Sequence, residues 1–383
     1  MAKLKIAYLT TWPPRECGIA TFTQDVAKTI AQISPKIDWE VIALNEPNTK
    51  YDYDRKVVMI IERDKYETYK KAAQYINESE ADAINFQHEF NLFEPKNHLR
   101  RFLEMIKKPI ITTLHTVFFP EIYKTPKLKK RNIALRSVLK NSDYIVTMCQ
   151  SGIEKIIKEY SFPRKNAFVI PHGAPEIERI SSGKAKKKIG YQNKNIILSY
   201  GLIGKGKNFE QMIKAMPEIL KRFPNTVYVI AGETHPRLSH DYHNFLKFLA
   251  KKLRLADKIV FIDHYMALDK IKNLIQATDI FVNTGRILNM VSSGTLTYAM
   301  VAGKCVISTP FIYAKDVLAK GRGQFVNVND HQGLAKIIIN LFKNPKKIKQ
   351  YEDKAYRYGR LLTWPKVCKE YVKLFEIAAR DKK

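Results

Sequence analysis

The sequence has few cysteines, no long apolar run and no apolar core of signal-peptide length, and each shortage argues against a class of protein. It has four cysteines in 383 residues, far apart and without paired spacing, which excludes a zinc cluster or a disulfide framework and is typical of a reducing cytoplasm. No apolar run reaches about 18 residues, so no transmembrane helix is expected. The first apolar run, within MAKLKIAYLTTWPP, is too short for a signal-peptide core and predicts a buried strand. We therefore expect a cytoplasmic protein.

Acidic residues are also scarce relative to basic ones. The chain has 37 Asp and Glu against 66 Lys and Arg, a formal net charge of +29. Such a surplus favours acidic partners, namely nucleic acid, an anionic membrane or phosphorylated substrates. A general bias toward solvated lysines explains the charge equally well. Nucleic acid is not expected as a partner, because no basic stretch has interleaved aromatic residues or the spacing of a known reading module.

Short apolar runs alternate with amphipathic ones over most of the chain. Amphipathic stretches at 21–33 and 69–79, and later at 210–223 and 243–255, predict helices between the apolar runs. This alternation predicts an α/β protein with parallel, doubly wound sheets. The predicted strands are 5–12, 39–44, 56–61, 82–87, 109–115 and 143–148 in a first series, and 195–201, 225–232, 257–263, 279–284 and 304–309 in a second.

Two Rossmann-like domains follow from the two series. The segment PEIERISSGKAKKKIGYQNKN between them is polar and rich in lysine, which is typical of a linker. Near Trp364 and Pro365 the helical spacing of the last segment is broken. The expected boundaries are an N-terminal domain at 1–176, a linker at 177–194, a C-terminal domain at 195–355 and C-terminal helices at 356–383.

Several stretches, in order along the chain, resemble one family. PPRECGIATFTQDVAKTI after the first strand is similar to the opening loop and helix of family 4 glycosyltransferases, which have the GT-B fold. The resemblance implies two Rossmann-like domains that face a cleft, the first for the acceptor and the second for a nucleotide sugar, with a last helix that crosses back to the first domain. The further matching stretches are FQHEF (86–90), TLHTVF (113–118), SDYIVTMCQSGIEKI (142–156), VIPHGAPE (169–176), YGLIGKGKNFEQMIKAMPEI (200–219), SSGTLTYAMVAGKCVIST (292–309) and TWPKVCKEYVKLFE (363–376).

The resemblance implies a set of donor-binding residues at strand ends. Lys207 matches a lysine that contacts the donor diphosphate, and Lys205 supplies charge where the family often has an arginine and this chain has Leu202. Ser293 or its neighbour caps a helix whose free amides would bind phosphates. Gly18 either lets the backbone approach a ligand or is a tight-turn glycine. The full set is Gly18, Gly201, Lys205, Lys207, Glu233, Ser292, Ser293, Gly294, Thr295 and Tyr298.

GLIGKGKN (201–208) also has an alternative interpretation. It is one residue short of a Walker A loop, with a strand before it and a helix after it. Asn208, however, stands where that loop has the Ser or Thr that holds magnesium. The family resemblance therefore explains the stretch better.

The chain departs from the family at two positions. Met290 and Tyr298 stand where many family 4 enzymes have glutamates, the first near the donor sugar and the second on the ribose. Methionine accepts hydrogen bonds weakly, whereas a tyrosine can still bond a ribose hydroxyl or stack against it. Donor binding can survive the change, and neighbouring Asn289 is a candidate for part of the sugar contact.

Histidines at strand ends are the remaining candidates. The resemblance implies that His115 contacts the donor sugar or the charge near its anomeric carbon, and that His88 and Glu89 contact the acceptor. His172 and His235 are expected to line the cleft. A lone histidine at a strand end is more often structural, so these assignments depend on the surrounding motifs.

The stretch KLKKRNIALRSVLK (127–140) predicts a basic amphipathic helix. Such a helix is typical of a peripheral contact with the inner face of an anionic membrane. A helix packed on the first domain with a solvated basic face explains the pattern as well.

Together these features predict a retaining hexosyltransferase of polysaccharide biosynthesis. GDP-mannose or UDP-glucose is the expected donor, and a glycan or lipid-linked molecule the acceptor. His115 and Lys207 are the expected catalytic residues, and no cofactor or metal is required, because lysines supply the positive charge. The alternatives are a GT-B phosphorylase, a nucleotide-sugar hydrolase or epimerase, and an inactive glycan-binding relative, since fold alone does not decide function.

Overall fold

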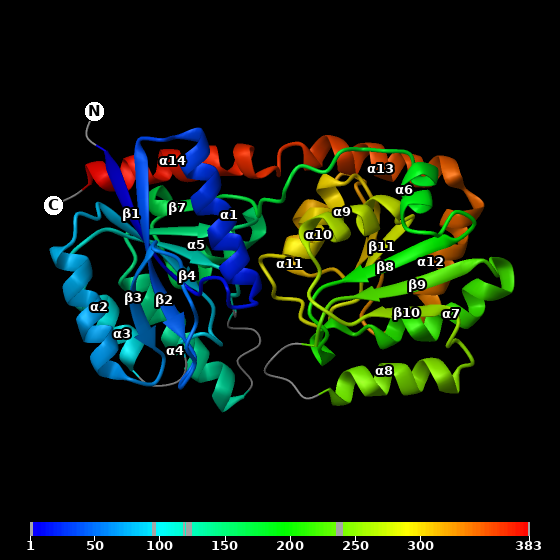
Figure 1. The fold of residues 1–383 in the computed structure, drawn as a ribbon, viewed down its shortest axis with the longest axis horizontal. Coiled ribbons are helices and arrows are strands. Elements are labelled where there is room, and N and C mark those ends of the chain that lie inside the picture. Colours follow the sequence, from blue (N-terminus) through cyan, green and yellow to red (C-terminus); the bar gives the residue numbers. More distant parts are fainter. Residues whose placement is uncertain (1–2, 94–96, 118, 120–124, 235–239, 382–383) are drawn as a thin grey trace. The chain divides into compact units, whose positions relative to one another are not determined.

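The computed structural model describes the whole chain except residues 1–2, 94–96, 118, 120–124, 235–239 and 382–383. The chain divides into two compact units (Figure 1). The first comprises Met1–Gly173, Asn289–Ser292 and Trp364–Lys383, and the second comprises Ala174–Leu288 and Ser293–Thr363. Each unit contains a parallel sheet with flanking helices, which confirms the predicted α/β class.

The sheet of the first unit has the order β3-β2-β1-β4-β5-β6-β7, and its strand pairs are parallel. Chain connections diverge between β1 and β4, and in open α/β sheets ligands bind beyond the carboxyl ends of the strands at such a point. The strands are β1 (Leu4–Thr10), β2 (Ile37–Asn45), β3 (Val57–Glu62), β4 (Ala83–His88), β5 (Ile110–Leu114), β6 (Tyr144–Thr147) and β7 (Ala167–Val169). The helices are α1 (Gly18–Ile33), α2 (Tyr66–Glu78), α3 (His98–Met105), α4 (Pro126–Lys140), α5 (Gln150–Tyr160) and α14 (Trp364–Arg380), with a 3₁₀ turn η2 (Arg164–Asn166).

The sheet of the second unit has the order β10-β9-β8-β11-β12-β13 and is also parallel. Its connections diverge between β8 and β11. The strands are β8 (Asn195–Tyr200), β9 (Thr226–Ala231), β10 (Ile259–Ile262), β11 (Ile280–Asn283), β12 (Cys305–Ser308) and β13 (Gln324–Phe325). The helices are α6 (Ser182–Lys188), α7 (Glu210–Arg222), α8 (Asp241–Lys252), α9 (Leu268–Ala277), α10 (Gly294–Val301), α11 (Ile312–Val317), α12 (His331–Lys343) and α13 (Pro345–Gly359), with a 3₁₀ turn η3 (Lys205–Lys207).

The predicted strands are all present, within about two residues of their expected bounds. Because helices cover both faces of a parallel sheet, central strands read as continuous apolar runs, and every residue of β4 and β9 is buried. The sequence pattern misses β7 and β13, which have three and two residues. Strands this short are below the length at which an apolar run can be recognised.

The segment 177–194, expected as a linker, belongs to the second unit and contains α6. Ser181 caps this helix by accepting a hydrogen bond from the amide of Lys184, 3.4 Å away. Nζ of Lys186 lies 2.7 Å from Oδ2 of Asp279, and the lysine is 9% exposed. One lysine of this lysine-rich segment is therefore buried and holds α6 to the rest of the second unit through an ion pair. The last part of the chain returns to the first unit only from Trp364 onward, so residues 356–363 lie in the second unit.

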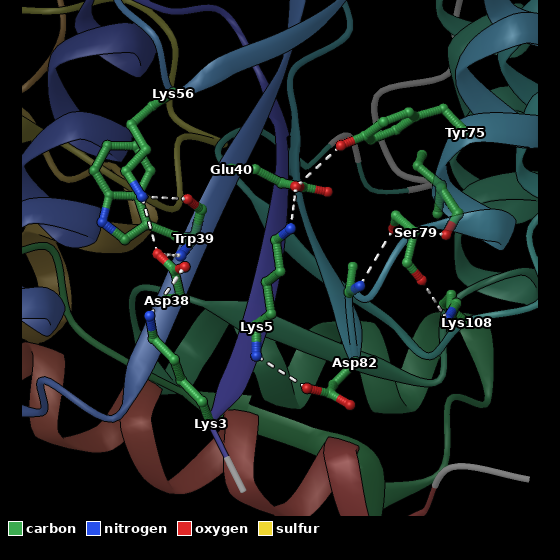
Figure 2. Close-up of polar contacts among 12 residues, drawn as sticks. Lys3, Lys5, Asp38, Trp39, Glu40, Lys56, Tyr75, Ser79, Asp82 and Lys108 are labelled. Carbon is green, nitrogen blue, oxygen red and sulfur yellow. Dashed lines mark hydrogen bonds and ion pairs between the residues drawn. The ribbon is translucent and has the colours of Figure 1, made fainter.

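An ion pair fixes the first sheet near the amino ends of its strands (Figure 2). Nζ of Lys5 on β1 lies 2.7 Å from Oε2 of buried Glu40 on β2, and the same carboxylate accepts from the hydroxyl of Tyr75, 3.1 Å away. This hydrogen bond raises the pKa of Lys5 against the effect of burial. The backbone amide of Lys5 donates to Asp82, 2.9 Å away. These groups pair with one another near the amino ends, whereas the candidate ligand-binding groups lie at the carboxyl ends.

Candidate functional site

The donor-binding residues expected in the second unit meet at the carboxyl end of β8. Gly201 follows β8 directly and has a φ of +130°, a conformation that favours glycine. A side-chain carbon at this position would lie 3.2 Å from Cγ2 of Thr295 and 3.6 Å from Nζ of Lys207. A bare backbone, an ammonium group and the first turn of α10 therefore share one place, at the point where the connections of the sheet diverge.

The end of β9 supports the loop that follows β8. Gly232 has a φ of +138°, and a side-chain carbon there would lie 2.3 Å from the carbonyl oxygen of Gly201. The amide of Ile203 donates to the carbonyl of Glu233, 2.7 Å away. Glu233, an expected donor contact, thus holds this loop through its backbone, and its side chain is half-buried. Gly232 is a structural requirement that the sequence pattern does not single out.

The two expected lysines lie on the 3₁₀ turn η3. Lys205 is exposed and Lys207 is half-buried. Burial lowers the pKa of Lys207, and no carboxylate of the described residues forms an ion pair with it. An ammonium group that has lost water and has no anionic partner favours a bound anion.

Asn208 holds the lysine turn in place. Its backbone is left-handed, with a φ of 59°, and its buried side chain donates to the carbonyl of Thr284, 3.1 Å away. The hydroxyl of Thr284 in turn donates to the carbonyls of Lys207 and Asn208, at 3.1 and 2.9 Å. A side chain used in this way cannot replace the magnesium-holding hydroxyl of a Walker A loop, and α7 begins only at Glu210. The Walker A interpretation is therefore wrong.

Arg286 is a further cation beside this turn, and it lies outside the motifs recognised in the sequence. Its backbone amide donates to the carbonyl of Gly206, 2.9 Å away, and its guanidinium pairs with buried Glu210. Glu210 also accepts from the hydroxyl of Tyr242. The side chain of Arg286 keeps 46% of its surface exposed. Its position just after β11 was the available signal, because ligands bind beyond the carboxyl ends of strands.

The N-terminus of α10 is capped by Ser293, as the sequence predicts. Its hydroxyl accepts from the amide of Leu296, 3.3 Å away, so the amides of Gly294 and Thr295 lie in the first turn, where no intrahelical acceptor exists. Ser292 falls in the first unit instead, and its hydroxyl donates to the carbonyl of His115, 2.8 Å away. The two adjacent serines thus have different roles: Ser293 caps α10, and Ser292 bonds the backbone of His115.

The two positions that depart from the family pattern also fall in different units. Half-buried Met290 belongs to the first unit, and half-buried Tyr298 on α10 to the second. The ring centroid of Tyr298 lies 6.5 Å from that of Tyr200, the last residue of β8. Burial raises the pKa of Tyr200, so its hydroxyl stays protonated. Tyr200 adds a second phenol that the motif comparison misses.

In the first unit, His88 and His115 lie at the ends of adjacent strands. Nε2 of His115 donates to Oε1 of Gln87, 2.8 Å away, which leaves Nδ1 of the neutral ring as an acceptor. Burial lowers the pKa of both histidines to about 3, and for His115 the neighbouring His172 and His88 add to this effect. Nδ1 of His88 has no hydrogen-bond partner among the described residues. Both imidazoles are therefore neutral near pH 7.

Aromatic rings lie against His115 and His172. The ring of Phe22 on α1 lies 5.0 Å from the rings of both His115 and His172, and Trp364 lies 5.7 Å from His172. A side-chain carbon at Gly173 would lie 2.0 Å from Trp364, so only glycine fits under the indole. Burial lowers the pKa of His172 to about 4. His235, a weaker candidate, lies outside the described residues.

The remaining first-unit candidates differ in how they are held. Oε2 of Glu89 accepts from the hydroxyl of Thr116, 2.6 Å away, and burial raises the pKa of Glu89 while this hydrogen bond lowers it. Gly18 is the first residue of α1, and a side-chain carbon there would meet nothing within 4 Å. Its φ is not in the left-handed region, so its backbone conformation does not require glycine. The open space at a helix N-terminus is available to a ligand.

The described part of the chain has neither a membrane-spanning helix nor a metal-binding cluster. In that part of the chain, no helix has the length and apolar character needed to cross a membrane. Nor do His, Cys, Asp or Glu side chains of the described residues form a group of three that could hold a metal ion.

The two parallel sheets with their flanking helices define a two-domain α/β protein of the GT-B type. The family model described as Glycosyltransferase Family 4 matches residues 18–176, and the one described as Glycosyl transferases group 1 matches residues 182–358. The chain belongs to the family 4-like glycosyltransferases. This confirms the predicted family and enzyme class.

Individual relatives are more distant. An uncharacterized glycosyltransferase of Methanocaldococcus jannaschii is 28% identical over 62% of this chain and 59% of its own length. The alpha-monoglucosyldiacylglycerol synthase of Streptococcus pneumoniae is 25% identical over 58% of this chain and 50% of its own length. The matched region thus spans little more than half of each of these two relatives. The structure of Anabaena HepE in complex with UDP and glucose superposes with a TM-score of 0.76 at 15% identity, covering 98% of this chain and all of that one, and shows the fold alone.

Proposed function

We propose that the chain transfers a hexose from a nucleotide-diphosphate sugar to a hydroxyl of a glycan or lipid-linked acceptor, with retention of anomeric configuration. The meeting of Gly201, Lys207 and Thr295 at one strand end is the observation on which the proposal rests. Bare backbone, an ammonium group and a helix N-terminus together suit a diphosphate. GDP-mannose and UDP-glucose are the donors to test first, and the UDP in the HepE structure supports the second.

The second unit would stabilise the leaving group. When the bond between the anomeric carbon and the diphosphate oxygen breaks, negative charge grows on the diphosphate. Lys207, assisted by Lys205 and the amides of 293–295, would offset that charge without reorganisation, which is the most effective form of electrostatic catalysis. Because burial lowers the pKa of Lys207, the ammonium gains more from an anion than a solvated lysine would. Cations that supply this charge make an obligatory metal or other cofactor unnecessary.

The first unit would handle the sugar and the acceptor. Positive charge develops at the anomeric carbon, so the neutral imidazole of His115 can accept a hydrogen bond from a sugar hydroxyl without repelling that charge. The acceptor hydroxyl, in contact with His88 and Glu89, would form the new bond on the face that the diphosphate leaves. Its proton would pass to the leaving phosphate oxygen. No protein nucleophile is needed, so methionine at position 290 is compatible with turnover.

The outer face of α4 supports an acidic or membrane-linked acceptor. Three of its aliphatic residues, Leu135, Val138 and Leu139, are buried in the first unit, whereas Ile133 is exposed. Its exposed face carries basic residues, namely Lys129, Lys130, Arg136 and Lys140. Contact with an anionic surface through α4 would therefore be electrostatic. The name of the pneumococcal relative, a diacylglycerol-glucolipid synthase, is in keeping with a lipid acceptor.

An inactive glycan-binding relative is the second candidate. It is favoured by Met290 and Tyr298, which stand at the two positions where the resembling enzymes have carboxylates. Donor turnover separates the two candidates, because a glycan binder would bind oligosaccharide but release no nucleoside diphosphate from a donor sugar. A phosphorylase, hydrolase or epimerase would turn over a donor with phosphate, with water or without acceptor.

The first test is a thermal-shift screen against GDP, UDP, ADP and dTDP and their common sugar conjugates. A ligand at one hundred times its Kd stabilises the fold by about 2.7 kcal/mol, a shift of a few degrees. Lys207→Ala should weaken the responding nucleotide about tenfold to a hundredfold, since a hydrogen bond to a charged group contributes about 1.5–3 kcal/mol. Exposed Lys214→Ala on α7, in the same unit, is the matched control and should bind as the wild type does.

Turnover of the responding donor is then measured with candidate acceptors, with and without a chelator. Release of nucleoside diphosphate that depends on acceptor and persists in chelator would support the proposal. If no nucleotide shifts the melting of folded protein, or if Lys207→Ala and Lys214→Ala bind alike, the proposed diphosphate site is wrong.

A further inference from the structure

Helix α8 of the second unit exposes two large aromatic side chains. Its inner face is buried against the unit and comprises Tyr242, His243, Leu246 and Ala250. On the outer face, Phe245 and Phe248 keep 43% and 62% of their surface exposed. Residues three apart lie on the same side of a helix, so the two rings form one apolar patch. Neither ring belongs to the buried core of the unit.

Basic residues surround these two rings. Lys247, Lys251 and Lys252 on the same helix are exposed, and residues 241–258 contain five Lys or Arg against two Asp. Only the first of the three lysines is near a carboxylate in the described part of the chain, with Nζ 4.0 Å from Asp263. That carboxylate already lies 3.0 Å from Nδ1 of His243. The outer face of α8 is therefore apolar at its centre and positively charged at its margins.

We propose that the outer face of α8 is a docking surface for an anionic lipid membrane. Aromatic rings at the level of the headgroups, with lysines beside them, are the side chains by which an interfacial helix binds anionic lipid. Both parts of the proposed surface have a matching part in the bilayer: the rings enter the boundary of the acyl chains, and the lysines meet lipid phosphates. Figure 1 shows α8 as a separate helix of the second unit, with α7 as its helical neighbour.

The chain's charge disfavours a second copy as the occupant. A pair of α8 faces would bring six lysines together in a protein that already has a net charge of +29, and like charges brought together oppose association. The surface also differs from α4, whose one strongly exposed large apolar residue among the described side chains is Ile133, at 69%. We expect α8, with two adjacent rings, to supply the apolar part of membrane binding.

The proposal does not depend on the donor or the acceptor proposed above. A chain without transferase activity, or a transferase with a soluble acceptor, would still bind vesicles through α8. Binding is therefore measured by co-sedimentation of the full chain with vesicles, and nucleotide binding is measured separately by thermal shift on the same preparations.

Vesicles of phosphatidylglycerol and phosphatidylcholine are compared with pure phosphatidylcholine. The test variants are Phe245→Ser/Phe248→Ser, which removes the rings, and Lys247→Gln/Lys251→Gln/Lys252→Gln, which removes the charges. The matched control is Lys343→Gln/Lys346→Gln/Lys347→Gln, which removes three exposed lysines from another part of the same unit. Because all substituted side chains are exposed, each variant should keep the wild-type Tm.

We expect the wild type to bind the anionic vesicles and to bind phosphatidylcholine at least tenfold more weakly. The ring variant and the α8 lysine variant should each lose about tenfold or more, since one lysine near an anionic surface strengthens binding about fivefold. The control should lose less than either. The nucleotide-induced shift should be unchanged in the ring variant.

The proposal is overturned if the wild type does not bind anionic vesicles, or if the control loses as much as the α8 lysine variant, which would indicate net charge alone. It is also overturned if the ring variant binds vesicles normally but changes from dimer to monomer in light scattering. That result would assign α8 to a second copy of the chain.

Discussion

In the first unit, the polar groups at the carboxyl ends of the strands include buried, neutral imidazoles, whereas in the second they are ammonium groups and helix N-terminal amides beside glycines. His115 is fixed by Gln87 at 2.8 Å, and its pKa of about 3 keeps it neutral. Lys207 stands without an ionic partner among the described residues, and burial lowers its pKa.

In the proposed function, this difference would let one βα architecture serve two chemical tasks. A diphosphate needs positive charge and amides close to the backbone, which Lys207 and the glycines of the second unit would supply. A sugar hydroxyl needs directional hydrogen bonds without charge, which neutral His115, whose tautomer is set by Gln87, would supply. Substituting the histidines of the first unit and the glycines and cations of the second tests this difference.

The largest effect on stability is expected at Gly232 of the second unit, for which Gly18 of the first unit is the control. Gly232→Ala should destabilise the fold by about 3 kcal/mol or more, because the new methyl would lie 2.3 Å from a carbonyl oxygen at a positive φ. Gly18→Ala meets open space and should leave the free energy of unfolding within about 0.5 kcal/mol of the wild type. Urea unfolding of both variants measures the difference. Equal stabilities would mean that the close approach of β8 and β9 is not a constraint.

Acid should affect the first unit next most strongly. The folded pKa of about 3 for His88 and His115 lies below the ordinary value of about 6.5, so the unfolded chain binds these protons first. Stability from this source is complete above pH 6.5 and falls as the pH falls toward 3, by about 2 kcal/mol for the pair between pH 6.5 and 5.5.

Replacing one of these histidines measures its share of the acid effect. His115→Gln should make the fall in unfolding free energy between pH 6.5 and 5.5 smaller by about 1 kcal/mol. Exposed His264→Gln in the second unit is the matched control for the loss of one imidazole. An identical profile for His115→Gln would show that this imidazole is not neutral in the folded chain.

Arg286 offers a way to separate charge from scaffolding in the second unit. Arg286→Ala should weaken donor binding about tenfold, because it removes a cation beside the lysine turn, and should also destabilise the fold by leaving buried Glu210 unpaired. Adding Glu210→Gln should restore the stability but not the affinity. Calorimetric titration and thermal melting of the three proteins measure the two effects. Recovery of affinity in the double variant would make Arg286 a purely structural residue.

The smallest effect is expected at Tyr298. Tyr298→Phe removes only a hydroxyl and should weaken nucleotide binding about twofold to tenfold, the value of one neutral hydrogen bond. Tyr298→Ala should weaken it more, because it also removes the ring that lies near Tyr200. The same titration measures both. If Tyr298→Phe binds as the wild type does, the phenol does not replace the family's ribose-binding glutamate through a hydrogen bond.

Local patterns in the sequence were sufficient for most of the elements and for part of the site. A strand such as β9 is buried on both faces and therefore appears as an apolar run. The cap of α10 could be predicted from Ser293, because a cap acts within a few residues of its own chain. Lys207 and His115 could be found because they follow recognisable strands. The family, too, was visible in motifs whose order along the chain is a linear property.

Only the tertiary structure decided which distant groups meet. Gly232 is required because its backbone approaches Gly201, Gly173 because Trp364 covers it, and Arg286 because Gly206 and Glu210 lie beside it. The same holds for the exposed rings of α8, whose periodicity is that of any amphipathic helix until the buried face is known. The sequence alone thus determined the elements and the family, since hydrophobic periodicity and helix capping act over a few residues, whereas contacts between residues far apart in the chain exist only once the sheets have formed.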